Sequence, residues 1–170
     1  MSGSTTLVFL RHVQTAGEDE NASMSEVGQR QLDQVTHVLR QYSISKIYSS
    51  DLWRAVQPAQ SLAKSLGVPF QSSSALREIR SGLEIPVPPS DAHNREDIDA
   101  FEQRVAKALN DIVELNEHTT VVVVAHSGTI RAALRYLLDL PLPSLDLPSV
   151  SQGGLIILKR GDSGKWKARS

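Results

Sequence analysis

Short apolar runs alternate along this chain with longer stretches in which apolar residues recur at helical spacing. Runs typical of buried strands cover residues 7–10, 46–49, 119–125 and 155–158. Amphipathic patterns predict helices over residues 26–41, 52–66, 97–116 and 129–140. Short extended pieces are expected near residues 68–70 and at Trp166. This alternation predicts an α/β fold, a three-layer α/β/α sandwich with a mostly parallel central sheet.

Several of these elements carry their own start or stop signals. Ser25 is a good N-cap for the first helix, and Gly67 is a good C-cap for the second. Pro141 and Pro143 close the last helix, because proline cannot continue it. No repeat or low-complexity tract interrupts the pattern, so one domain covering residues 1–170 is expected.

The composition is ordinary for a globular protein and argues against several classes. Hydrophobic residues make up 40% of the chain and charged residues 22%. A formal net charge of −1 gives no general attraction for nucleic acid or an anionic membrane, so neither is an expected partner. The absence of cysteine excludes disulfides and thiolate nucleophiles. Since no apolar run approaches about 20 residues and the start is not signal-like, a cytoplasmic protein is expected.

Candidate chemistry lies where the predicted strands end. Arg11 and His12 follow the first strand, and His126 follows the strand ending at residue 125. Arg54 comes shortly after the strand near residues 46–49. Open α/β folds place their ligands at the carboxyl ends of the strands, so these side chains are expected in one crevice. Two imidazoles and two guanidinium groups in one crevice suggest a phosphate pocket.

These residue types suit phosphoryl transfer. A neutral His12 is a competent nucleophile, and Arg11 and Arg54 present planar forks to phosphate oxygens. His126, if protonated, adds a donor and a positive charge, while Ser127 and Gly128 add backbone N–H groups at the start of a helix. No metal and no cofactor are expected, because the arginines repel a cation and no His-x-x-x-His pair accompanies the histidines.

Four segments resemble, in order, the signatures of the histidine phosphatase superfamily, also called phosphoglycerate mutase-like. They are LRHVQT at residues 10–15, SSDLWRAVQ at 49–57, LRE at 76–78 with Gly82, and VAHSGTIR at 124–131. The resemblance runs from the first strand to the last. Four ordered matches are far more specific than an isolated Arg-His pair, which chance places in many proteins.

The resemblance implies a phosphoglycerate mutase-like fold and a set of roles. His12 becomes transiently phosphorylated, Arg11, Arg54 and His126 bind the phosphoryl group, and Glu78 is the acid and base. Glu18, Glu84 and Asp91 are the alternative acids. The expected function is cofactor-independent hydrolysis of a phosphomonoester, either a small phosphorylated metabolite or a phosphoprotein. Mutase activity is not expected, since the chain has no room for the long insertions of mutases.

The chain departs from the family pattern at one position beside the nucleophile. Most members have glycine there, whereas this chain has Val13, a β-branched residue expected to narrow the approach to His12. The loops at residues 16–24 and 81–94 are expected to shape substrate access. The early segment at residues 24–28 resembles compact phosphohistidine phosphatases, whereas Glu78 with Gly82 resembles small-metabolite phosphatases, including cobalamin-pathway enzymes.

Two other functional classes are compatible with some of these residues. One is a catalytically inactive module that binds phosphate or a phosphoprotein in the same pocket. The other is a serine hydrolase using Ser127, but the residues around it lack the Gly-x-Ser-x-Gly elbow of such enzymes. Phosphatase chemistry on His12 is therefore the leading expectation.

Overall fold

The strands form one six-stranded sheet in a computed structural model that describes residues 3–19, 21–79 and 97–169. The elements are β1 (Thr5–Arg11), α1 (Glu26–Leu39), β2 (Ile44–Ser50), α2 (Trp53–Leu66), β3 (Phe70–Ser73), the 3₁₀ turn η1 (Ser74–Leu76), α3 (Ile98–Leu115), β4 (Thr120–Ala125), α4 (Ser127–Leu138), the 3₁₀ turn η3 (Ser144–Asp146), β5 (Leu155–Arg160) and β6 (Trp166–Ala168). Every expected strand and helix is present.

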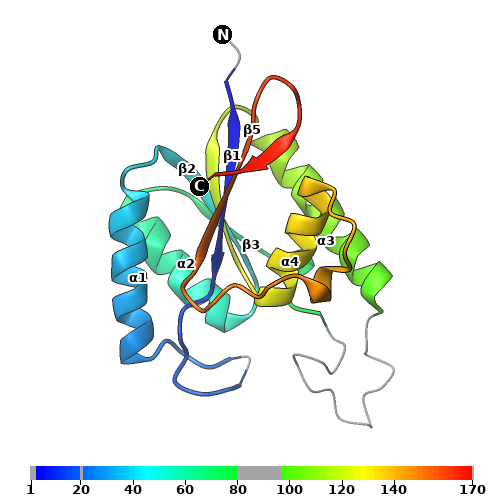
Figure 1. Ribbon diagram of the computed structural model, residues 1–170. Coiled ribbons are helices and arrows are strands. Elements are labelled where there is room, and N and C mark those ends of the chain that lie inside the picture. Colours follow the sequence, from blue (N-terminus) through cyan, green and yellow to red (C-terminus); the bar gives the residue numbers. More distant parts are fainter. Residues whose placement is uncertain (1–2, 20, 80–96, 170) are drawn as a thin grey trace.

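The strand order is β3-β2-β4-β1-β5-β6. The first four of these strands pair in parallel, whereas β5 runs antiparallel to both β1 and β6. Helices α1 and α2 cover one face of the sheet, and α3 and α4 cover the other (Figure 1). This arrangement confirms the predicted three-layer α/β/α sandwich with a mostly parallel sheet.

Alternation along the central strands explains why both faces are covered. In β1, Val8 and Leu10 join the core under α1 and α2, whereas Leu7 and Phe9 join the core under α3 and α4. All four side chains are buried, so residues 7–10 of β1 form an apolar run that is covered on both faces. Such a strand is stable only with a helical layer on each side of it.

The helix ends follow the local signals, with one exception. The Ser25 hydroxyl accepts a hydrogen bond from the Gly28 amide at 3.0 Å, and Gly67 takes the left-handed conformation with φ of 68°. Both caps therefore lie where the sequence predicts them. Helix α4 begins at Ser127, two residues earlier than expected, with His126 at its N-cap position. No helix in the described part of the chain is long and apolar enough to span a membrane.

The parallel strands carry their carboxyl ends to one edge of the sheet, the lower edge in Figure 1. Strand β1 ends at Arg11, β2 at Ser50 and β4 at Ala125. Because β1 and β4 pair Arg11 with Ala125, the residues that follow, His12 and His126, leave the sheet side by side.

Candidate active site

The two imidazoles lie together at the carboxyl ends of β1 and β4. Their ring centroids are 5.4 Å apart, and the ring planes are tilted by 58°. Both side chains are buried, with His12 5% and His126 1% exposed. The structure thus places side by side two residues that are separated by more than a hundred positions in the sequence.

His12 has the protonation pattern of a nucleophile. Its Nδ1 lies 3.0 Å from the backbone oxygen of Val13, and a carbonyl can only accept, so Nδ1 carries the proton. The lone pair is therefore on Nε2. Burial, followed by the positive charges of Arg54 and Arg11, lowers the pKa of His12 to about 4, although the hydrogen bond to Val13 opposes this shift. At neutral pH the ring is uncharged.

His126 is held by a hydroxyl group. Its Nε2 lies 2.7 Å from the Oγ of Ser50, the last residue of β2. Burial is the main reason that the pKa of His126 lies well below its usual value, and the charge of Arg54 acts in the same direction. From the sequence, a positive charge on His126 is expected only if the ring is protonated. Its surroundings disfavour protonation, so His126 contributes a neutral ring.

The arginines lie around these rings. Arg11 is partly buried and donates from Nη1 to the backbone oxygen of Val150 at 2.7 Å. Its Nε is buried and makes no hydrogen bond to any residue that the structure describes. Arg54, in the first turn of α2, acts electrostatically on both His12 and His126. The pocket thus combines positive charge with a buried N–H donor, the features that bind a phosphoryl group.

Glu78 packs against the start of α4, next to His126, and the residue is only 4% exposed. Its Oε2 accepts from the Gly128 amide at 3.0 Å, and its Oε1 accepts from the Ile79 amide at 3.0 Å. Glu78 also partly offsets the lowering of the Arg11 pKa that burial causes. The Gly128 amide, which sequence reasoning offered to a bound anion, thus binds this carboxylate.

The alternative acids have different surroundings. Glu18 is exposed, in the loop after β1. Glu84, Asp91 and Gly82 lie outside the described residues, as does the loop at 81–94 that was expected to shape substrate access. Among the described candidates, only Glu78 is buried against the N-terminus of α4.

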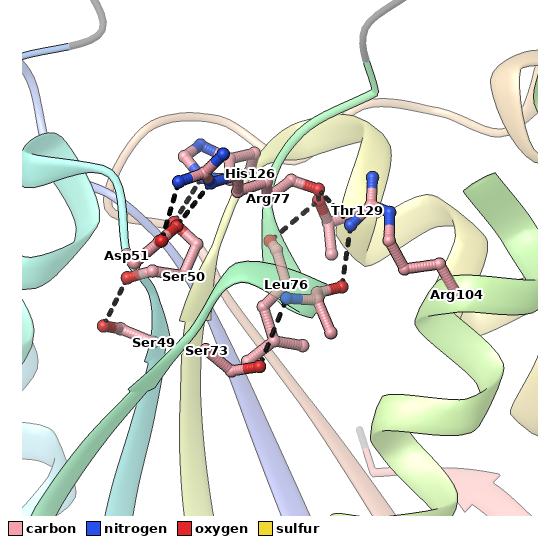
Figure 2. Close-up of polar contacts among 10 residues, drawn as sticks. Ser49, Ser50, Asp51, Ser73, Leu76, Arg77, Arg104, His126 and Thr129 are labelled. Carbon is pink, nitrogen blue, oxygen red and sulfur yellow. Dashed lines mark hydrogen bonds and ion pairs between the residues drawn. The ribbon is translucent and has the colours of Figure 1, made fainter. Parts of the chain in front are cut away.

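The backbone around Glu78, residues 75–79, is held by side chains from α3 and α4. Arg104 donates from Nη1 to the backbone oxygens of Ala75 and Arg77, at 2.7 and 3.1 Å, and Thr129 donates to Arg77 at 3.1 Å. The Arg77 side chain forms a two-point ion pair with Asp51, at 2.6 and 2.8 Å (Figure 2). Sequence reasoning missed these contacts, although Asp51, Arg77 and Thr129 all lie within its matching segments.

Val13 has a different place from the one expected. Its side chain is 0% exposed and belongs to the core under α1 and α2, together with Val8 and Leu10. The side chain therefore fills core volume, while the backbone oxygen of the same residue orients His12.

The loop after β1 is fastened to the start of α2. A bridge joins Thr15 to Met24, and the Met24 amide donates to the side chain of Gln57 at 2.8 Å. The Trp53 indole donates to Ser23 at 3.2 Å. This loop therefore borders the helix turn that carries Arg54, as a loop that shapes substrate access would.

The described residues form no cluster suited to a metal ion. Within residues 3–19, 21–79 and 97–169, no group of three or more His, Cys, Asp or Glu side chains is arranged to hold a metal ion. The polar groups of the crevice are suited to an anion, because its fixed charges are the guanidinium groups of Arg11 and Arg54.

Known proteins are similar to this chain in sequence and in fold. The curated relative 6-phosphofructo-2-kinase/fructose-2,6-bisphosphatase 1 of Mus musculus is 27% identical over 138 residues, 70% of this chain. The chain spans 28% of the length of that relative. A mycobacterial glucosyl-3-phosphoglycerate phosphatase, solved with inorganic phosphate, is 26% identical with a TM-score of 0.76, over 97% of this chain and 95% of that chain.

A third similarity concerns the fold alone. The alpha-ribazole phosphatase from Shigella flexneri is 19% identical, with a TM-score of 0.80 over 96% of this chain and 94% of that chain. The family model of the histidine phosphatase superfamily (branch 1) matches residues 7–85 and 84–170, nearly the whole length. The chain therefore belongs to branch 1 of the histidine phosphatase superfamily.

Proposed function

We propose that this protein is a cofactor-independent phosphatase that hydrolyses a phosphomonoester through a phosphohistidine on His12. The observation that carries the proposal is the state of His12, whose proton is held on Nδ1 by Val13 while Nε2 keeps its lone pair. The chain belongs to the histidine phosphatase superfamily, and it is similar in structure to a known phosphatase. Both findings support phosphatase activity.

In the first step, Nε2 of His12 attacks the phosphorus atom. A nitrogen–phosphorus bond forms and the bond from phosphorus to the leaving oxygen breaks. Glu78, in its protonated form, gives its proton to that oxygen and becomes a carboxylate. The alcohol leaves, and His12 carries the phosphoryl group.

In the second step, Glu78 accepts a proton from water as the water oxygen attacks the phosphohistidine. The nitrogen–phosphorus bond breaks, inorganic phosphate forms, and Glu78 is again protonated. Arg11, Arg54 and His126 stabilise the negative charge on the phosphoryl oxygens in both steps. Each group returns to its starting state, so no cofactor is consumed.

For the substrate, we propose a small phosphorylated metabolite in preference to a phosphoprotein. The support comes from the relatives, because the mycobacterial protein is a phosphatase of glucosyl-3-phosphoglycerate. The loop after β1 is held against the helix turn that carries Arg54, where it can contact a small substrate.

The test is steady-state hydrolysis of p-nitrophenyl phosphate, a panel of phosphorylated metabolites and a phosphohistidine protein, with a chelator present. We expect turnover in the wild type and in His37→Ala, which removes an exposed histidine of α1. We expect none in His12→Ala. Full activity in His12→Ala would refute the proposal, and tight phosphate binding without any hydrolysis would favour the binding module.

A further inference from the structure

We infer that Ser50 is a positioning residue that fixes the tautomer of His126, so that the proton of its neutral ring lies on Nδ1. The inference deepens the proposed function and rests on it, because it assigns how His126 binds a phosphoryl oxygen. Both residues lie in segments that carry the resemblance, but the resemblance assigns no role to Ser50.

The geometry of the pair is fixed by the sheet. β2 pairs in parallel with β4, with Ser49 opposite Val124, so Ser50 ends its strand where His126 leaves the neighbouring one. The Ser50 side chain is 0% exposed, and its Oγ lies 2.7 Å from Nε2 of His126 (Figure 2). A buried contact of this length between a hydroxyl and an imidazole nitrogen is a hydrogen bond.

Counting donors and acceptors decides which partner donates. If Ser50 donates, its hydroxyl proton and the Nε2 lone pair of His126 are both satisfied, and only one N–H donor, at Nδ1, is left over. If His126 donates instead, the Ser50 proton and the Nδ1 lone pair both lack a partner among the described residues. The first arrangement leaves one buried group unsatisfied and the second leaves two.

The remaining donor is the one that the proposed reaction needs. Nδ1 of His126 is buried and makes no hydrogen bond to any described residue, and its ring lies beside that of His12. A phosphoryl group on or near His12 can accept this N–H. His126 thereby serves as a donor without being charged, which fits its burial beside the imidazole of His12.

The tautomer can be measured directly. In protein labelled with ¹⁵N-histidine, a long-range ¹H–¹⁵N correlation spectrum distinguishes a protonated ring nitrogen from a bare one. The chain has five histidines, so the His126 signals are assigned by their loss in His126→Gln. At neutral pH we expect a protonated Nδ1 and a bare Nε2. A wild-type ring with its proton on Nε2 would overturn the inference.

Variants then test what the tautomer does. We expect Ser50→Ala to redistribute the proton between the two nitrogens and to weaken binding of inorganic phosphate roughly tenfold, measured by calorimetry. Ser50→Thr keeps the hydroxyl and should retain both signatures. Ser49→Ala is the matched control, because Ser49 is equally buried but donates to a backbone oxygen, at 2.7 Å.

The outcomes separate this inference from the proposed function. Wild-type phosphate affinity in Ser50→Ala would overturn the inference, as would an equal loss in Ser49→Ala. Neither readout requires turnover. A wild-type protein that shows the Nδ1 tautomer but hydrolyses nothing would refute the phosphatase and leave the assignment of Ser50 intact.

Discussion

The surroundings of His12 keep its imidazole neutral, which is the state that the proposed nucleophile requires. Burial removes the hydration that would stabilise a protonated imidazole, and the charges of Arg54 and Arg11 repel it. A phosphate ester brings negative charge into the same space and reverses that balance. The two arginines that disfavour protonation of His12 are therefore also suited to binding a phosphate.

This state of His12 has a consequence for stability. With a pKa of about 4 in the folded protein and 6.5 as its ordinary value, His12 binds a proton in the unfolded chain before it does so in the folded one. Between those two pH values the unfolded state holds more protons, so the free energy of unfolding falls as the pH falls. For His12 alone the loss is on the order of 3 kcal/mol.

Urea denaturation at pH 7 and at pH 4.5 measures this loss. We expect the decrease to be smaller in His12→Asn than in the wild type, because the variant has no imidazole to protonate at this position. His37→Ala, which removes an exposed imidazole, should keep the full decrease. The same decrease in His12→Asn as in the wild type would contradict the assigned pKa.

Val13 shows how one residue can serve two purposes. We expect Val13→Ala to lower the free energy of unfolding by about 2 kcal/mol, because it removes two buried methyl groups. Phosphatase turnover should stay close to that of the wild type, since the backbone oxygen that holds His12 is unchanged. Denaturation and steady-state kinetics on the same variant test both statements. Unchanged stability with altered substrate preference would instead place this side chain at the substrate.

At the scale of elements, the start of α4 contacts both His126 and Glu78. His126 occupies the N-cap position, and the amide of Gly128, two residues later, holds the Glu78 carboxylate. A helix N-terminus stabilises a negative charge, so it stabilises the carboxylate that Glu78 becomes in the proposed first step. The N-terminus of α4 thus sets the position of Glu78, the proposed acid, relative to His126, which we propose binds the phosphoryl group.

Gly128 is required for that contact. A Cβ at this position would overlap Oε1 of Glu78. We therefore expect Gly128→Ala to displace the acid and to lower turnover of alkyl phosphates roughly tenfold or more. Turnover of p-nitrophenyl phosphate should fall less, because its leaving group needs less help from an acid. Leaving-group dependence of kcat is the measurement.

Gly161→Ala is the matched control, because a Cβ there meets nothing within 4 Å. A double-mutant cycle adds a second check. In the Glu78→Ala background, Gly128→Ala should cost no further activity, since the overlapping carboxylate is gone. A further loss in that background would show that Gly128 acts through another part of α4.

At the scale of the molecule, the sequence predicted the layers of the fold and the edge of the sheet at which the candidate residues lie. The apolar runs and the capping residues Ser25 and Gly67 were enough for the order of elements, because both are local signals. The strand–helix alternation predicted that His12 and His126 leave the sheet at the same edge. That β1 and β4 are neighbours, which brings the two rings together, is seen only in the structure.

Contacts between distant side chains could not be predicted in this way. The pairs Ser50–His126 and Glu78–Gly128 join residues that are far apart in the sequence, and neither has a local pattern. The burial of Val13 was also missed, because β-branching describes a side chain's shape and does not say which face of the sheet it covers. The short turn η1, which leads to Glu78, has too few residues to show a period.

Trapping the phosphorylated enzyme tests the central claim most directly. Wild-type protein is mixed with radiolabelled p-nitrophenyl phosphate, quenched in base within one turnover, digested and mapped by mass spectrometry. We expect acid-labile, base-stable label on the peptide that contains His12, the same label in His37→Ala and none in His12→Ala. Turnover by the wild type without label on that peptide, or with label on another residue, would contradict the account.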